Sequence, residues 1–250
     1  MNIIQRPSPN RAIGRQGFTP DFIVCHTTGG SFTSAVNTVL NPANQVSYHF
    51  IISRLGEIVQ CVNIADTAWA NGTTNSGDNR DNRHSTVAEI VQRRVNANLY
   101  TVSIGFADMP SGNPSPQQLD AGVWLIRHIA AEVRRIYGYN MRLGRERIIG
   151  HNEITPIRKP GCPGRGFPFD EIIMDVHMPQ ANEVKAPPPA PSPDRPFADV
   201  PPGHWSEEAF SKMHKLGLIS GLGDGTVGFG QPMETERIVQ LMWNVVKRFE

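Results

Sequence analysis

The 250-residue sequence lacks a marked excess of either charge. Its 24 Lys and Arg residues almost balance its 23 Asp and Glu residues, and this argues against a dedicated nucleic-acid-binding protein. No stretch approaches the roughly 18 apolar residues of a membrane-spanning helix, so we expect no membrane span. The first residues, MNIIQRP, also lack the apolar run of a secretory signal, so we expect synthesis in soluble form in the cytoplasm.

Cysteine is scarce, with only Cys25, Cys61 and Cys162 in the chain. Three thiols cannot all pair, and they do not resemble a disulfide framework. Cys25 and Cys61 each lie in an apolar, strand-like run, which favours buried thiols. Cys162 differs from them because it lies in a loop of glycine and proline, where a purely structural cysteine is less expected.

Proline is concentrated in residues 186–196, which read APPPAPSPDRP. Repeated prolines remove amide donors and favour extended polyproline II, so this segment predicts a semi-rigid spacer of roughly 30 Å at about 3.1 Å per residue. We therefore expect a first domain of residues 1–185, a linker of residues 186–196 and a tail of residues 197–250.

Strand-like and helix-like segments are interleaved in the first domain. The longest helix is expected at 116–137, where Ser115 can cap the amino end, Pro116 suits the first turn and Gln118 completes a capping-box pattern. The other expected elements are strands at 22–25, 46–52, 57–62 and 101–106, and helices at 34–40, 87–96 and 169–176. This order predicts an α/β fold with a mixed central sheet flanked by helices.

One early histidine and a late histidine–cysteine pair are the candidate metal ligands. His26 ends the apolar run FIVCH and precedes TTGG, a loop that lets a substrate approach the backbone. His151 and Cys162 begin and end the segment HNEITPIRKPGC. Three nitrogen and sulfur ligands from two distant segments can hold zinc and leave its fourth tetrahedral position free for water, as in catalytic zinc sites.

The sequence around these ligands, over roughly Phe22 to Phe169, resembles the type-2 family of zinc-dependent N-acetylmuramoyl-L-alanine amidases, whose fold is shared with peptidoglycan recognition proteins. The resemblance implies a zinc ion bound by His26, His151 and Cys162. It also implies hydrolysis of the amide between the lactyl group of N-acetylmuramic acid and L-alanine in peptidoglycan. Such an enzyme acts at the bacterial cell wall as an endolysin or autolysin, with antimicrobial effect, and without a signal it must leave the cell by another route.

The resemblance also implies two catalytic residues. Tyr48 matches the tyrosine of the family's Tyr-His-Phe strand, where the phenol faces the zinc. The alternative for Tyr48 is core packing beside Phe50 and Ile52. Lys159 matches the lysine before the last ligand, whose positive charge can stabilise a tetrahedral oxyanion.

Three residues are the candidate substrate contacts, namely Thr27, Trp69 and Asn71. Thr27 begins the loop after His26, and WANG at 69–72 matches a loop that often reads Trp-His-Ala-Gly in the family. The family histidine is missing from this loop, so no chemistry is expected at position 70. Trp69 can either line a groove or serve as a structural tryptophan.

One departure from the family leaves the general base open. Ala107 stands where many members carry glutamate, and Asp108 can substitute only if a bulge turns it inward. Either catalysis relies on Tyr48, Lys159 and the metal, or the protein is a non-catalytic peptidoglycan-binding module. Cys162 argues against the second hypothesis, because binding-only relatives generally lose a metal ligand.

Two further hypotheses are weaker. A cysteine hydrolase using Cys25 is disfavoured because strand alternation places Cys25 and His26 on opposite faces, and apolar neighbours would raise the thiol pKa. A calcium loop at Asp78, Asp81 and Asn82 lacks a glutamate at the required distance.

The tail, residues 197–250, resembles one S-layer homology module, a small helical unit that attaches proteins to cell-wall polymers in its family. The resemblance rests on FADVPPGHW at 197–205 and GLISGLGDGT at 217–226. The family's Thr-Arg-Ala-Glu stretch is replaced by TERI at 235–238, and the chain holds a single copy where three are common. The tail therefore implies a secondary cell-wall polymer as partner, with altered polymer-binding residues.

Overall fold

The computed structural model of the chain forms two compact units, Met1–Met178 and Pro179–Glu250, and each is described by itself. Most of the expected linker at 186–196 and both Asp78 and Asp81 of the calcium-loop alternative lie outside the described residues. The structure describes residues 1–72, 82–109, 112–178, 196–200, 206–221, 225–227, 229 and 235–247.

A six-stranded sheet in the order β1-β5-β4-β7-β3-β8 forms the centre of the first unit. β4 and β5 pair antiparallel, whereas the neighbouring pairs on either side are parallel, so the predicted mixed sheet is confirmed. The strands are β1 (Ile3–Gln5), β3 (Phe22–Thr27), β4 (Phe50–Ile52), β5 (Ile58–Gln60), β7 (Thr101–Phe106) and β8 (Ile148–Gly150). A separate antiparallel pair joins β2 (Arg11–Ala12) and β6 (Thr67–Ala68).

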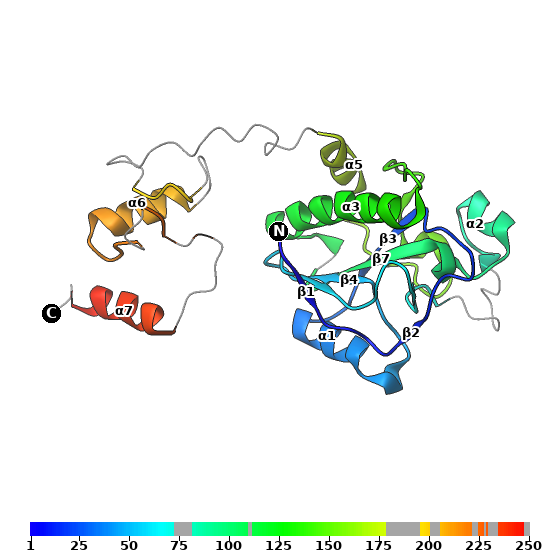
Figure 1. Cartoon of the computed structure of the whole chain (residues 1–250), viewed down its shortest axis with the longest axis horizontal. Helices are drawn as coiled ribbons and strands as arrows, with labels where there is room; N and C mark the ends of the chain where they lie inside the picture. The colour runs from blue at the N-terminus through cyan, green and yellow to red at the C-terminus, as the bar shows by residue number, and fades with distance from the viewer. Residues whose placement is uncertain are drawn as a thin grey trace. The chain divides into compact units, whose positions relative to one another are not determined.

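Helices cover both faces of this sheet, as Figure 1 shows for α3 on one side and α1 on the other. The helices of the first unit are α1 (Phe32–Leu40), α2 (Ala88–Arg93), α3 (Pro116–Tyr137), α4 (His151–Ile154) and α5 (Phe169–His177), and short 3₁₀ turns lie at η1 (Pro42–Asn44) and η3 (Ala97–Tyr100).

The longest helix, α3, has the expected bounds. The Ser115 hydroxyl accepts a hydrogen bond from the Gln118 backbone N–H at 3.1 Å, and the helix ends at Gly138 with φ 67°. The expected capping box is wrong, because the Gln118 side chain donates to the carbonyls of Ile52 and Ala107 instead. This side chain therefore ties α3 to the ends of β4 and β7.

Side-chain alternation divides the sheet into two faces. Ile104 and Phe106 of β7, together with Cys25 of β3, belong to the large core cluster beneath α3. Phe22 and Val24 of β3 belong to a separate cluster on the opposite face, so alternation places His26 on that face as well.

The expected strand at 57–62 is shorter, Ile58–Gln60, and two further strand boundaries that differ from those expected lie beside the candidate site. β3 continues through Thr27, so His26 lies within the strand instead of after it. β4 begins only at Phe50, because the pairing before it is irregular: the N–H groups of Cys61 and Val62 both donate to the His49 carbonyl. Tyr48 therefore lies outside the regular alternation of β4.

The second unit is a small helical module, as the sequence predicts. It contains α6 (Glu207–Lys215) and α7 (Thr235–Val246), and TERI at 235–238 begins α7. The Asp199 carboxylate accepts hydrogen bonds from the N–H groups of Val227 (2.9 Å) and Phe229 (2.7 Å). Among the helices of the described residues, none is long and apolar enough to cross a membrane.

Candidate functional site

The candidate ligands His26 and His151 lie at the carboxyl ends of neighbouring parallel strands. β3 pairs with β7 so that His26 is opposite Gly105, and it pairs with β8 so that Cys25 is opposite Gly150. His151 directly follows β8 as the first residue of α4. Ligand sites in parallel α/β sheets gather at this edge, so the topology itself brings the two histidines together.

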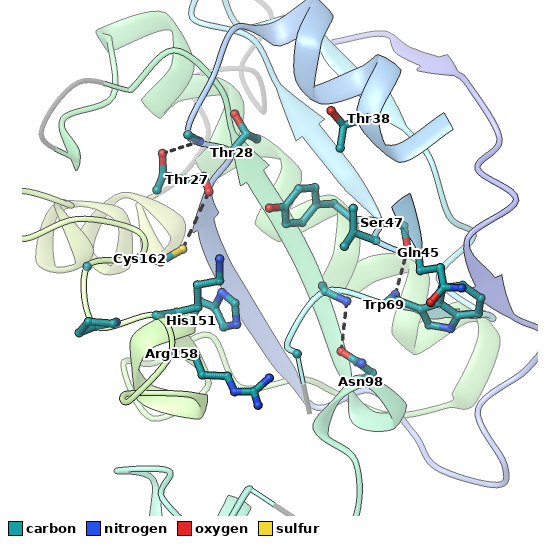
Figure 2. Close-up of a pocket in the computed structure, with 18 of the residues that line it drawn as sticks. Thr27, Thr28, Thr38, Gln45, Ser47, Trp69, Asn98, His151, Arg158 and Cys162 are labelled. Atoms are coloured by element: carbon teal, nitrogen blue, oxygen red, sulfur yellow. Dashed lines mark hydrogen bonds between the residues drawn. The ribbon is translucent and has the colours of Figure 1, made fainter. Parts of the chain in front are cut away.

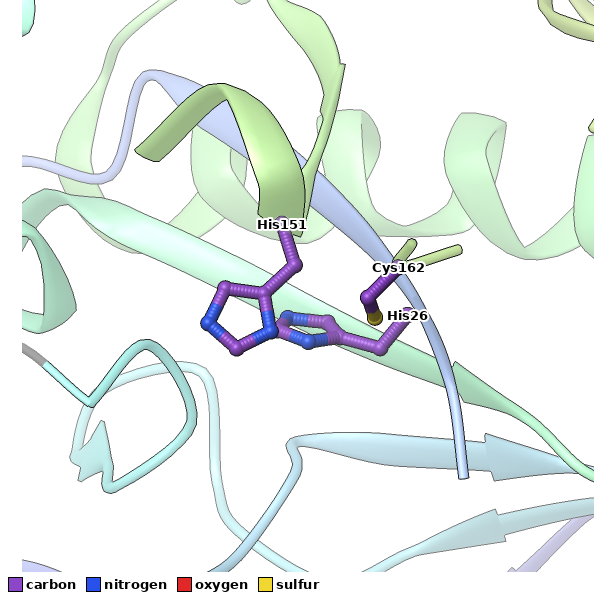
Figure 3. A group of neighbouring side chains, drawn as sticks. All are labelled: His26, His151 and Cys162. Carbon is purple, nitrogen blue, oxygen red and sulfur yellow. The ribbon is translucent and has the colours of Figure 1, made fainter. Parts of the chain in front are cut away.

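Hydrogen bonds to the backbone position α4 and the loop that carries Cys162. The Gly150 N–H donates to the Glu153 carboxylate at 2.7 Å, which fixes the first turn of α4. The Asn152 N–H donates to the Cys162 carbonyl at 2.8 Å. The Cys162 thiol in turn lies 3.9 Å from the Thr27 carbonyl, and Figure 3 shows it beside both imidazole rings.

These three side chains form a compact, buried donor set. One ligand atom from each of His26, His151 and Cys162 lies within 4.8 Å of the others, and the two ring centroids are 4.4 Å apart. Both ring nitrogens of His26 and the Nε2 atom of His151 are buried without a hydrogen-bond partner among the described residues. Leaving such groups unpaired costs about 1–3 kcal/mol each, so the arrangement fits a ligand that accepts nitrogen and sulfur donors, as zinc does.

Burial also sets the protonation of the donor set. It lowers the pKa of His26 well below its usual range, with further lowering by His151 and Lys159. Burial lowers the pKa of His151 to about 4, and it raises the pKa of the Cys162 thiol to about 11. Both rings are therefore neutral at pH 7 and keep a lone pair for a cation, whereas a bound cation would favour the Cys162 thiolate.

A pocket of about 1020 Å³ opens beside the donor set. It includes four of the sequence-predicted site residues besides His151 and Cys162, namely Thr27, Tyr48, Trp69 and Lys159, and Figure 2 shows its walls. The remaining lining residues are Thr28, Gly29, Thr38, Gln45, Val46, Ser47, Ala70, Gly72, Asn96, Asn98, Arg158, Pro160 and Gly161.

Tyr48 lies against the donor set. Its ring meets that of His26 edge-on at a centroid distance of 5.1 Å, and burial raises the pKa of its phenol. It does pack against a core cluster, but against the one that contains Ile51, whereas Phe50 and Ile52 belong to the core beneath α3. Tyr48 therefore presents a protonated hydroxyl at neutral pH.

Lys159 and the neighbouring Arg158 both line the pocket. Lys159 is exposed, and its positive charge lowers the pKa values of His26, His151 and Cys162. Its carbonyl accepts a hydrogen bond from the Cys162 N–H at 3.2 Å, so the lysine belongs to the same turn as the third candidate ligand. No Asp or Glu is among the described residues that line the pocket.

The two residues considered for the general base lie elsewhere. Ala107 is fully buried in the cluster that contains Val36 and Val39 of α1. Asp108 has φ 51°, and its carboxylate accepts a hydrogen bond from the Phe32 N–H at 3.1 Å. Asp108 thus stabilises the start of α1 and does not substitute for the missing glutamate.

The structure argues against a cysteine hydrolase that uses Cys25. This thiol is fully buried in the core beneath α3, on the opposite face of the sheet from His26. Burial also raises the pKa of the thiol. Cys25 is consequently a core residue.

Asn71 and Asn98 differ from the sequence-based picture. Asn71 is fully buried and is not among the residues that line the pocket, so its side chain is not placed to contact a substrate. Asn98 was not singled out by the sequence, although it lines the pocket beneath the backbone of residues 70–71. One feature of the sequence could have drawn attention to Asn98: it is a polar residue between the apolar residues Ala97 and Leu99, just before a strand.

Comparison with protein families gives two matches within the chain. Residues 16–165 match the model described as N-acetylmuramoyl-L-alanine amidase, and residues 196–228 match that described as S-layer homology domain. A curated relative, 1,6-anhydro-N-acetylmuramyl-L-alanine amidase AmpD of Haemophilus influenzae, is 27% identical over 132 residues. That alignment spans 53% of this chain and 59% of the relative.

Solved structures with a similar course of the chain include the catalytic domain of XlyA, at 21% identity and a TM-score of 0.47. The similarity covers 70% of this chain and 99% of that one. Another is N-acetylmuramoyl-L-alanine amidase LysC from Clostridium intestinale URNW, at 17% identity and a TM-score of 0.44, covering 72% and 99% of the two chains.

Proposed function

Because the chain belongs to the N-acetylmuramoyl-L-alanine amidase family, we propose that it hydrolyses the amide between the lactyl group of N-acetylmuramic acid and L-alanine in peptidoglycan. The observation that carries the proposal is the convergence of His26, His151 and Cys162 beside a pocket of about 1020 Å³, whose lining includes His151 and Cys162 but not the fully buried His26. Such a pocket is large enough for a muramyl peptide segment, since ligand sites commonly measure about 300–1,000 Å³.

The proposed cofactor is zinc, held by His26, His151 and Cys162. The three donors are buried, the two histidines are neutral at pH 7, and their unpaired ring nitrogens suit a metal. When bound there, zinc supplies Lewis-acid polarisation of a carbonyl oxygen and lowers the pKa of water towards about 7.

Tyr48 and Lys159 are the proposed catalytic residues. Attack of water on the amide carbonyl produces a tetrahedral oxyanion, and the C–N bond then breaks to release a carboxylate and the L-alanine amine. Lys159 and Tyr48 both line the pocket, and the Tyr48 ring lies against that of His26. We propose that the Lys159 ammonium and the Tyr48 hydroxyl donate hydrogen bonds to this oxyanion.

Both residues carry their protons at neutral pH, so they are proposed to donate a proton to the departing amine nitrogen, while the proton lost by the attacking water passes to solvent. The described pocket lining contains no Asp or Glu, and Asp108 is engaged by the Phe32 N–H. Thr27 and Trp69 are the proposed substrate contacts, since the Trp69 side chain is 37% exposed in the pocket wall.

The binding-only alternative is less well supported. A module that only binds peptidoglycan has no need for three buried ligand atoms within 4.8 Å of one another. Burying unpaired imidazole nitrogens is costly, so their retention favours a bound metal and hence catalysis.

The C-terminal unit is proposed to attach the protein to a secondary cell-wall polymer, because residues 196–228 match the S-layer homology domain. The proposed division is a catalytic domain of residues 1–185, a linker of residues 186–196 and an attachment module of residues 197–250. Attachment would raise the effective concentration of the catalytic domain at the wall. Comparing the retention of the full chain and of residues 1–185 on purified walls tests this role, and equal retention would contradict it.

The amidase activity is tested by incubating purified cell walls with the protein and measuring newly exposed L-alanine amino groups. We expect release that a chelator abolishes and added zinc restores. His26→Ala should abolish it, whereas His128→Ala should not, because His128 stacks on Trp124 in α3 beneath the other face of the sheet. Equal release with chelator, or in His26→Ala, would contradict the proposal.

A further inference from the structure

Ser47 holds the backbone of Trp69 in the pocket wall. The Trp69 N–H donates to the Ser47 hydroxyl at 2.9 Å, and the Ser47 N–H donates to the Trp69 carbonyl at 3.2 Å. Figure 2 shows the first of these hydrogen bonds as a dashed line between the two residues. Among the described residues, Trp69 lies outside the core clusters, so the position of its ring depends on these backbone hydrogen bonds.

The Ser47 hydroxyl is held in turn by the N-terminal segment, defined here as residues 8–14. It donates to the Asn10 carbonyl at 2.5 Å, and both residues are buried. The Asn10 side chain donates to the carbonyls of Val39 and Asn41, at 3.0 Å and 2.9 Å, where α1 ends. One buried hydroxyl therefore joins the backbone of the pocket wall to the N-terminal segment.

The N-terminal segment also holds the strand that precedes Trp69. β2 pairs antiparallel with β6, which ends at Ala68. The Asp66 carboxylate accepts hydrogen bonds from the Arg11 side chain at 3.1 Å and from the Gly14 N–H at 2.9 Å. The match to the amidase family begins at residue 16, so this support of the pocket wall lies outside the matched residues.

We propose that Ser47 is a positioning residue for substrate binding, which acts through Trp69 and is anchored by Asn10. By fixing the Trp69 backbone, it keeps the indole ring in the wall against which a muramyl peptide lies. This inference rests on the proposed function, in which Trp69 contacts the substrate.

Tyr48 follows Ser47 directly but is anchored separately. The His49 N–H donates to the Ser103 carbonyl of β7 at 3.1 Å, and the Tyr48 ring packs against the cluster that contains Ile51. Loss of the Ser47 hydroxyl should therefore raise KM and leave kcat nearly unchanged, which is the signature of weakened substrate binding. A merely structural role would lower the unfolding midpoint without this separation of KM from kcat.

The test uses the full chain with paired substitutions. Ser47→Ala removes the hydroxyl, whereas Ser47→Thr retains it, and Asn10→Ala removes the donors that fix the N-terminal segment. Ser115→Ala is the matched control. The Ser115 hydroxyl likewise accepts from a backbone N–H and donates to a backbone carbonyl, and Ser115 is not among the described residues that line the pocket. Thermal unfolding identifies any variant that fails to fold.

The kinetic measurement gives kcat and KM for N-acetylmuramyl-L-alanyl-D-isoglutamine from the release of L-alanine amino groups. We expect Ser47→Ala to raise KM about tenfold, roughly the effect of losing one well-placed contact. Asn10→Ala should raise KM as well. Ser47→Thr should keep KM closer to that of the unaltered protein than Ser47→Ala does, and Ser115→Ala should leave it unchanged.

A double-mutant cycle tests whether Ser47 acts through Trp69. Trp69→Ala should raise KM by itself, and adding Ser47→Ala should then change KM little, because the ring that Ser47 positions is gone. The indole N–H signal of Trp69 in ¹H–¹⁵N NMR, assigned with Trp69→Phe, reports on the ring without catalysis. This signal should shift in Ser47→Ala and Asn10→Ala but not in Ser115→Ala.

An unchanged KM in folded Ser47→Ala would overturn the proposal, and so would an unchanged indole signal. A rise in KM of the same size in the Trp69→Ala background would show that Ser47 does not act through Trp69. Absence of cleavage by the unaltered protein would instead contradict the proposed function, and the indole signal would still decide whether Ser47 positions the ring.

Discussion

Gly105 lies under the Tyr48 ring and opposite His26, so Gly105→Ala tests how closely the pocket is packed. A Cβ atom at this position would lie 3.0 Å from Thr28 Cγ2 and 3.1 Å from Tyr48 Cδ2. Carbon atoms rest at about 3.5–4.0 Å, so the Tyr48 ring must shift by about 0.4–0.9 Å. Thr28 lies equally close to the added methyl group and must move as well.

The expected effect is larger on activity than on stability. Overpacking lowers the free energy of unfolding by about 1–3 kcal/mol. Alanine also makes the unfolded chain less flexible than glycine does, and this offsets about 0.4–1 kcal/mol of the loss. A misplacement of about 1 Å can lower a rate about 100-fold, so we expect kcat to fall by about tenfold or more. Zinc content should remain unchanged, because neither Thr28 nor Tyr48 belongs to the donor set.

The assay measures release of L-alanine amino groups from walls, together with zinc content and the unfolding midpoint. Gly30→Ala is the matched control, since its Cβ would meet only Ser34 atoms at 3.8–4.0 Å, an ordinary contact. A folded Gly105→Ala variant with the activity of the unaltered protein would refute the argument that the position of Tyr48 limits catalysis.

Three further substitutions test separate parts of the account. Tyr48→Phe should lower kcat by about 10²–10³ with zinc retained, and normal turnover would remove the phenol from the mechanism. Ala107→Glu should lower the unfolding midpoint, because the position is fully buried among apolar side chains; an unchanged midpoint would contradict the packing. Burial raises the pKa of Glu89, but Arg147 and Arg93 outweigh it and lower that pKa below its usual value. Glu89→Gln should therefore lower the midpoint at neutral pH, with the difference lost as pH falls below about 4; a pH-independent difference would be contrary evidence.

Much of the central sheet and its main helix could be predicted from local signals. The bounds of β7 and α3 match because β-branched and apolar residues mark the strand, while Ser115 and Gly138 mark the helix ends. His26, His151 and Cys162 could be grouped only through the family resemblance. Their convergence depends on the register of β3 with β8, which the chain order does not specify.

The parts that could not be predicted depend on tertiary contacts. Gln118 carries a capping-box pattern, yet the buried carbonyls of Ile52 and Ala107 offer its amide better-placed acceptors. Asp108 becomes a partner of Phe32 only because β7 ends beside the start of α1. The polar position of Asn98 between Ala97 and Leu99 does not indicate its partner, because its hydrogen bond to the Asn71 backbone joins residues far apart in the sequence.

The most direct test of the central claim is mass spectrometry of a defined muramyl peptide incubated with the zinc-loaded protein. We expect one water to be added across the lactyl–L-alanine amide, giving N-acetylmuramic acid with a free lactyl carboxylate and a peptide with a free L-alanine amine. His26→Ala and Cys162→Ala should produce neither fragment. An intact substrate, or cleavage at a glycosidic bond or within the peptide, would contradict the assignment.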